Sequence, residues 1–352
     1  MHRDDVPAAV SPPGGTDAVE RADSDGPGFR TLMLYSAVCV LVAGGALYGL
    51  SKLWGSPVLS AGYIGLMFLA PAIRILNFKG MLAATGWAMV ILILGVLIGQ
   101  HGPWVQLGGV VATALGQGMF VVSGSAGLNR SPASLVGFSK FAETGTLADV
   151  WQPLIGLAIG ATAIIVLGLV AFGSKKKVAA PAPLSERLFY GVGLAIGSAL
   201  LTVVWTFAGW GGLGYALLVF CLIYTYDSGQ VIHNSTIRVF GALLGVVSSV
   251  LLSWLLSPWP AVLITLFVIC GILALASLLN KQEFWFVVFL VAAVVHLAEI
   301  TPGKSAFDSG VEHVLGVVGA AVVAVLLHFV AVPLHDKLLK PALAARANHS
   351  GS

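Results

Sequence analysis

Ionisable side chains are scarce in this sequence, and those beside or inside its apolar segments are the ones that could do chemistry. A charge is costly within a bilayer, so an Arg, Asp or His there needs a functional or structural reason. The largest such group comprises Arg74, Lys79, Asp227, His233 and Arg238. Its three basic residues would attract an anionic substrate, as desolvated guanidinium groups do well. Asp227 or His233 would couple a proton, because histidine titrates near neutral pH.

A second group of ionisable residues lies at the opposite ends of the apolar segments. It includes Glu143, His296 and Glu299. Glu143 and Glu299 occupy equivalent places in an internal repeat, which favours a shared role in an outer vestibule or in proton coupling. For both groups the alternative is an ordinary set of solvated loop charges, with the basic residues placed as the positive-inside rule requires.

Motifs for other kinds of chemistry are not found. Gly209–Gly214 reads G-W-G-G-L-G, but it lies between two apolar segments rather than between a strand and a helix. Cys39, Cys221 and Cys270 lie in apolar runs without the spacing of metal ligands. We therefore expect no catalytic residues, no metal and no cofactor, and a protein that is not an enzyme.

The composition is that of a membrane protein. Of 352 residues, 58% are hydrophobic and 9% charged, whereas a soluble domain has about a quarter charged residues. A helix needs about 20 apolar residues to cross the hydrocarbon core. The sequence predicts twelve spans: 31–52, 57–75, 80–99, 104–123, 128–142, 152–172, 187–208, 211–226, 236–256, 259–279, 284–299 and 312–332. Two of them, 128–142 and 211–226, are short and could be tilted, broken or re-entrant.

The distribution of Lys and Arg predicts the orientation in the membrane. With the N-terminus inside, fifteen of these residues lie in inner segments, and only Lys52, Lys140 and Lys304 lie outside. The positive-inside rule then places both termini in the cytoplasm. We expect a multi-pass protein of the bacterial cytoplasmic (inner) membrane.

An internal repeat divides the chain into two halves. Four short motifs and one longer stretch recur in order with an offset of 151 to 160 residues. They are Gly62-Tyr63 as Gly214-Tyr215, Pro103-Trp104 as Pro258-Trp259, Leu128-Asn129-Arg130 as Leu279-Asn280-Lys281, Ala142-Glu143 as Ala298-Glu299, and LIGLAIGATA from Leu154 as VLGVVGAAVV from Val314. Two six-helix direct repeats would be related by a pseudo-two-fold axis along the membrane normal. The expected organisation is a disordered cytoplasmic tail (1–30), repeat 1 (31–173), a basic cytoplasmic linker (174–186), repeat 2 (187–333) and a cytoplasmic C-terminal tail (334–352).

Pairs of glycines at four-residue spacing recur along the predicted helices. They are Gly45/Gly49, Gly156/Gly160, Gly193/Gly197 and Gly241/Gly245. In lipid, this spacing is typical of helices whose backbones approach each other closely. We expect these pairs to serve packing.

The second half resembles a known family. An Arg precedes a G-x-x-x-G helix in IRVFGALLGVVSSVLLSWLL, a proline-bounded hairpin and a short polar turn follow, and HVLGVVGAAVVAVLLHFV forms the last helix. This order resembles the fusaric-acid-resistance-like family of membrane proteins, which includes aromatic-acid exporters, and is more distantly similar to plant aluminium-activated malate channels. The resemblance is strongest over 187–332. It implies a six-helix unit that pairs, with an anion pathway near the axis between the units.

These observations predict a membrane transporter or channel-like permease for small organic anions, aromatic ones included, driven by a proton or other gradient. The alternative is a non-transporting scaffold or accessory subunit of a cell-envelope assembly. The expected partners are the lipid bilayer, a small organic anion and further copies of the chain, with no nucleic acid. Arg74, Lys79, Asp227, His233 and Arg238 form the predicted inner group. Within it the two halves differ, because the repeat aligns Ala83 of the first half with Arg238 of the second.

Overall fold

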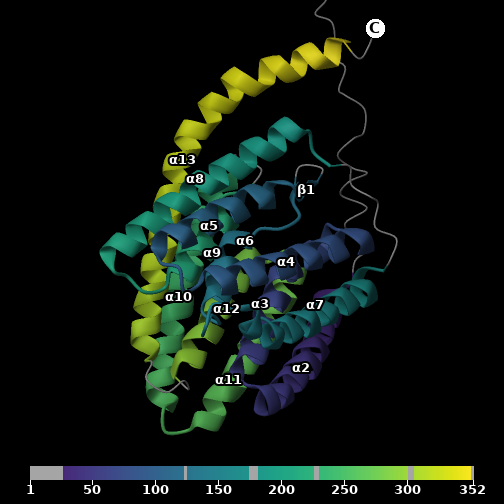
Figure 1. Cartoon of the computed structure of the whole chain (residues 1–352). Coiled ribbons are helices and arrows are strands. Elements are labelled where there is room, and N and C mark those ends of the chain that lie inside the picture. Colours follow the sequence, from purple (N-terminus) through teal and green to yellow (C-terminus); the bar gives the residue numbers. More distant parts are fainter. Residues whose placement is uncertain (1–26, 123–124, 174–180, 226–229, 300–304, 350–352) are drawn as a thin grey trace, which may run out of the picture.

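The computed structural model describes residues 27–122, 125–173, 181–225, 230–299 and 305–349, and these are almost entirely helical. The first half contains α2 (Phe29–Trp54), α3 (Ser56–Leu69), η1 (Ala70–Arg74), α4 (Phe78–Ile98), α5 (Pro103–Gly118), α6 (Ser131–Ser139), η2 (Leu147–Asp149) and α7 (Trp151–Phe172). The second half contains α8 (Leu184–Ala208), α9 (Leu213–Ile223), α10 (Val231–Leu256), α11 (Pro260–Leu279), α12 (Glu283–Glu299) and α13 (Ala306–His349). A small antiparallel hairpin of β1 (Val121–Val122) and β2 (Ser125–Ala126) joins α5 to α6 (Figure 1).

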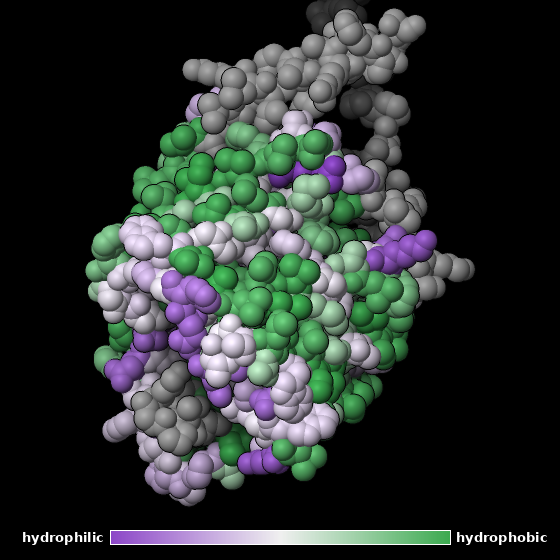
Figure 2. Space-filling view, in the orientation of Figure 1, coloured by the Kyte–Doolittle hydropathy of each residue, from purple (hydrophilic) through white to green (hydrophobic). Residues whose placement is uncertain are grey.

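Eight helical segments in the described chain are long and apolar enough to cross a membrane. They are α2, α3 with η1, α4, η2 with α7, α8, α10, α11 and the first part of α13. Large apolar side chains also remain exposed along them, for example Phe240, Val247 and Leu251 on α10. Figure 2 shows broad apolar areas on the surface of the molecule. The protein is therefore an all-α, multi-pass membrane protein, as its composition predicts.

Helical residues lie in each of the twelve predicted spans, but four of these segments are not among the eight that are long and apolar enough to cross a membrane. They are α5 with 16 residues, α6 with 9, α9 with 11 and α12 with 17. At 1.5 Å per residue, a helix of 11 residues covers about 17 Å, well short of a hydrocarbon core of about 30 Å. Segments 128–142 and 211–226 thus contain helices of partial length. Most residues of α6 are buried, so protein rather than lipid covers this short helix.

The last helix is longer than the sequence predicts. Instead of ending near residue 332, α13 continues to His349 and contains 44 residues. It passes through Pro333 and Pro341, at which the pattern predicts an end to the helix. Figure 1 shows the C-terminal part of α13, in yellow, extending away from the other helices. The segment expected to be a tail from residue 334 is thus helical as far as His349.

Three of the four glycine pairs lie at close helix contacts. A Cβ atom built on Gly156 would lie 2.0 Å from the carbonyl oxygen of Val58, and one on Gly160 would lie 2.1 Å from that of Gly62. Such distances are far below van der Waals contact, so only glycine lets α7 cross α3 at this spacing. On α2, by contrast, nothing lies within 4 Å of a Cβ atom built on Gly45 or on Gly49.

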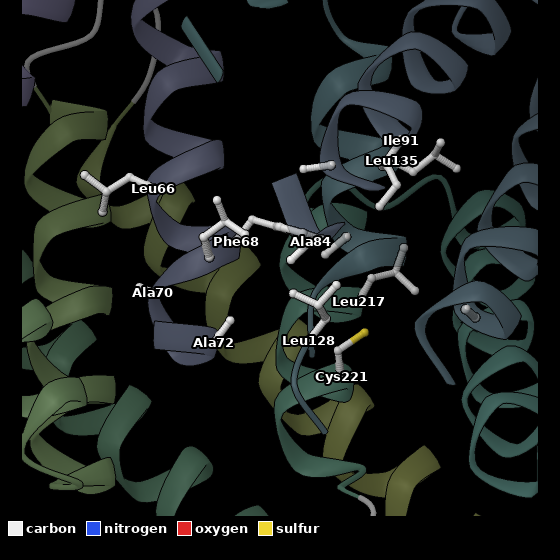
Figure 3. Close-up of a cluster of buried hydrophobic side chains, with 14 of the residues drawn as sticks. Leu66, Phe68, Ala70, Ala72, Ala84, Ile91, Leu128, Leu135, Leu217 and Cys221 are labelled. Carbon is white, nitrogen blue, oxygen red and sulfur yellow. The ribbon is translucent and has the colours of Figure 1, made fainter. Parts of the chain in front are cut away.

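One apolar core joins the two halves. The main buried cluster includes Leu66 and Phe68 of α3, Leu135 of α6, and Leu217 of α9. Figure 3 shows Leu128, at the start of the α6 segment, beside Leu217 and Cys221 of α9. Helices of the two halves also pack directly, with α5 against α8 and α2 against α11. The interior between the halves is therefore filled mainly by apolar side chains.

Candidate functional site

Among the described members of the predicted inner group (Arg74, Lys79, His233 and Arg238), Arg238 is the one that is buried. It lies on α10, three and seven residues before Gly241 and Gly245, and therefore on the same helix face. A Cβ atom on Gly245 would lie 2.8 Å from the carbonyl oxygen of Val288 on α12, so the two helices approach closely there. This approach brings Arg238, which is 5% exposed, onto α12, with its guanidinium carbon 5.6 Å from the ring centroid of Phe286.

Arg130 reaches the same aromatic ring from the other half of the chain. It precedes α6, is 2% exposed, and has its guanidinium carbon 5.7 Å from the ring centroid of Phe286. Its Nη1 donates a hydrogen bond to the carbonyl oxygen of Met67 in α3. That oxygen lacks its usual helical donor because the residue four positions later is Pro71, which has no N–H. The break in α3 thus creates the acceptor that holds Arg130 inside the protein.

The two arginines leave several hydrogen-bond donors unsatisfied. Within the described chain, Nε and Nη2 of Arg130 and Nε and Nη1 of Arg238 are buried and have no hydrogen-bond partner. An unpartnered buried donor costs about 1–3 kcal/mol, and more when it is charged. Arg238 also acts electrostatically on Arg130, which adds repulsion between two like charges. The arginine pair, Arg130 and Arg238, is therefore a place where a small anion would be strongly favoured.

The N-terminus of α6 does not supply further donors at this place. Its first amide, of Ser131, donates to Oε1 of Gln117 at 2.8 Å, and the next residue is Pro132. Gln117 is fixed in turn, because its Nε2 donates to the hydroxyl of Tyr190 at 3.1 Å. The donors free to bind an anion therefore belong to the arginine side chains.

A separate group of polar side chains lies beside the loop before α9. A Cβ atom built on Gly211 in this loop would lie 2.1 Å from a carboxylate oxygen of Glu312 on α13. The ring of His313 lies against that of Tyr215 on α9, with centroids 3.8 Å apart. Tyr215, Glu312 and His313 thus gather where α9 and α13 begin.

The other members of the predicted inner group lie elsewhere. Arg74 donates from Nη1 to the carbonyl oxygen of Leu279 at 2.7 Å, which caps the C-terminal end of α11, and it lies 5.5 Å from the ring centroid of Phe172. Lys79 and His233 are exposed. Asp227 lies outside the described residues. From this group, therefore, only Arg238 belongs to the candidate site. The second residue of the site is Arg130, which the sequence analysis counts only among the Lys and Arg residues of the inner segments.

The predicted outer group is used mainly in local contacts. Glu143 is exposed. His296 is buried, and its Nδ1 lies 3.0 Å from the hydroxyl oxygen of Ser253 on α10. The carboxylate of Glu299 accepts a hydrogen bond at 2.9 Å from the amide of Ala306, the first residue of α13. Among the described residues, no three His, Cys, Asp or Glu side chains gather as metal ligands would.

Replacing Arg74 by methionine should lower the thermal stability of the protein. The change removes a charged donor from the carbonyl end of α11, where positive charge is favourable, and leaves the Leu279 oxygen without that partner. We expect a loss of about 1–3 kcal/mol, the usual effect of losing a charge-assisted hydrogen bond. Melting in detergent, compared between the wild type and the Arg74→Met variant, measures it. An unchanged melting temperature would show that the contact contributes nothing to stability.

Comparison of the chain with protein-family models, with curated proteins and with solved structures found no match.

Proposed function

We propose that this protein is a secondary transporter or channel-like permease for small organic anions, and that the anion passes the arginine pair. One observation carries the proposal: two buried guanidinium groups, one from each half, share the ring of Phe286 and keep four nitrogen atoms without hydrogen-bond partners in the described chain. Guanidinium groups match carboxylates in shape and charge, so an organic acid would satisfy several of these donors at once. Phe286 adds an apolar surface on which the carbon skeleton of the acid, including an aromatic one, could lie.

The packing of the helices supports the proposed six-plus-six repeat. In the first half α3 packs on α7, α4 on α6, and α5 on α6; in the second half α9 packs on α13, α10 on α12, and α11 on α12. If α2 to α7 of the first half correspond in order to α8 to α13 of the second, these are the same three pairs. The contacts between halves, α5 with α8 and α11 with α2, also exchange with each other under this shift. A pseudo-two-fold relation between 31–173 and 187–333 accounts for both sets.

The proposed anion pathway lies near the pseudo-two-fold axis between the two repeats. The arginine pair supports this placement, because Arg130 belongs to the first repeat and Arg238 to the second, and their guanidinium carbons lie 5.7 and 5.6 Å from the Phe286 ring centroid.

The remaining parts of the proposal rest on the sequence. The resemblance to the fusaric-acid-resistance-like family favours an anionic substrate. The distribution of Lys and Arg favours cytoplasmic termini, and we propose the bacterial cytoplasmic membrane as the location. A proton or substrate gradient would supply the driving force. Arg74, Lys79, Asp227 and His233 remain predicted contributors at the inner entrance.

Uptake into proteoliposomes tests the proposal. Labelled butyrate and benzoate are the probes, labelled choline is the cation control, and protein-free liposomes set the background. We expect both acids, and not choline, to enter faster than in protein-free liposomes. Uptake of both acids at the background rate, by protein that melts cooperatively, would contradict the transport proposal.

A different observation favours a scaffold or accessory subunit as the second candidate. Phe68, Phe138, Phe220 and Phe286 are large side chains no more than 1% exposed, so the apolar clusters to which they belong are closely filled. A scaffold needs no open pathway. Stable co-purification with one cell-envelope enzyme, together with background uptake of both acids, is the result that this candidate predicts.

A further inference from the structure

Glu283 is the acidic side chain that accompanies the arginine pair. It lies in the first turn of α12, three residues before Phe286, so the carboxylate and the aromatic ring share one helix face. Its Oε2 lies 3.6 Å from Nη2 of Arg238, and its side chain is 49% exposed. This separation allows charge compensation but exceeds the 2.7–3.2 Å of a usual N–H···O hydrogen bond. Glu283 therefore lowers the net charge of the site without occupying the remaining donors.

The charges around Phe286 do not balance. Arg130 and Arg238 carry two positive charges, and Glu283 carries one negative charge. Among the described residues, Arg238 is the charged group that acts on Arg130, and Glu283 is the one that acts on Arg238. One positive charge thus remains in a region where burying an uncompensated charge costs several kcal/mol. A single negative charge on a bound molecule would neutralise it.

We propose that Glu283 sets the charge of the anion that the arginine pair binds. With the carboxylate of Glu283 in place, the site takes a monovalent organic anion, and without it the site takes a divalent one. This inference rests on the proposed transport function and adds a substrate charge class to it. A second carboxylate on the ligand would meet the carboxylate of Glu283 beside Arg238, where like charges repel.

Glu186 offers a matched control for the substitution. It lies in the first turn of α8, as Glu283 lies in the first turn of α12, so each carboxylate interacts favourably with a helix N-terminus. Glu186→Gln and Glu283→Gln therefore each remove one negative charge from the first turn of a helix. Only Glu283 faces an arginine of the pair.

The test compares two labelled four-carbon acids, butyrate with one carboxylate and succinate with two. Both are measured in one proteoliposome preparation, so their uptake ratio does not depend on the fraction of folded protein. We expect the wild type and Glu186→Gln to favour butyrate. Glu283→Gln should raise the succinate-to-butyrate ratio about tenfold or more, which corresponds to about 1.4 kcal/mol. Glu283→Lys should raise it further, because it adds a positive charge instead of only removing a negative one.

Two outcomes would overturn the inference, and only the second of them also rejects the transport proposal. A ratio that is unchanged in Glu283→Gln and Glu283→Lys, while both acids still enter above background, rejects the role of Glu283 and leaves the transport proposal intact. Background uptake of both acids by the wild type rejects the transport proposal, and the role of Glu283 with it.

Discussion

Arg238→Met should abolish uptake of organic acids and yet leave the protein at least as stable as the wild type. The arginine contributes two unpartnered nitrogen atoms to the proposed site, and a hydrogen bond to a charged group is worth about 1.5–3 kcal/mol. Losing such bonds corresponds to roughly a hundredfold decrease in uptake at low substrate concentration. The stability should not fall, because a buried charge with unsatisfied donors is replaced by a side chain of similar length that packs on Phe286.

Arg238→Lys separates charge from geometry in the same experiment. Lysine keeps the positive charge but cannot offer two parallel N–H groups to a carboxylate, so we expect uptake between that of the wild type and that of Arg238→Met. Uptake rates per folded protein and melting temperatures in detergent check both parts. Wild-type uptake by Arg238→Met would remove Arg238 from the pathway. A large drop in its melting temperature would show instead that Arg238 is a structural residue.

Gly160→Ala should disrupt the contact between α3 and α7 and destabilise the whole protein. The added Cβ atom would lie 2.1 Å from the carbonyl oxygen of Gly62 and 3.1 Å from the amide nitrogen of Leu66. Both atoms belong to the backbone of α3, so the clash can be relieved only if the helices separate. We expect a loss of about 3 kcal/mol or more, at the upper end of the usual range for overpacking. Unfolding in a denaturing detergent, followed by circular dichroism, measures this loss.

Gly45→Ala is the matched control for this prediction. Gly45, like Gly160, belongs to a G-x-x-x-G pair within a predicted span, but nothing lies within 4 Å of an added Cβ atom. Alanine is a better helix former than glycine by about 1 kcal/mol, so the variant should be neutral or slightly more stable. Equal stabilities of the two variants would mean that the close approach of α3 and α7 does not hold the fold together.

The positions of the helices along the chain could be predicted from the sequence because proline and glycine residues determine many of the helix ends. Pro103 and Pro260 stand at the first positions of α5 and α11, and Gly55 lies between α2 and α3 with a φ of 103°, a conformation that favours glycine. The sequence indicates that segments 128–142 and 211–226 are short for full spans, but it does not show where α6 and α9 begin and end. Their length depends on burial among other helices, which a sequence pattern does not contain.

The C-terminal helix shows the limit of turn signals. Pro333 and Pro341 predict a break, since proline removes an N–H group and clashes with the preceding turn. The structure carries α13 past both residues to His349. A proline can be accommodated as a bend in a helix, and the local signal cannot distinguish a bend from an end.

Arg130 shows why half of the candidate site was missed. In the sequence it belongs to Leu128-Asn129-Arg130, next to Ser131-Pro132, and this pattern is typical of a polar turn between spans. Its burial depends on an acceptor 63 residues earlier, the Met67 oxygen that Pro71 leaves free. A signal was nevertheless present, because Arg130 lies inside the predicted span 128–142, and an ionisable residue inside a span is a candidate by default.

The most direct test of the anion site is the melting temperature of the purified protein as a function of butyrate or benzoate concentration. Binding to the folded state raises apparent stability by about 2.7 kcal/mol at a hundred times the dissociation constant. We predict that either acid stabilises the wild type, and that Arg130→Gln and Arg238→Met each remove this stabilisation. Acid-dependent stabilisation that survives in both variants would contradict the assignment of the anion to the arginine pair.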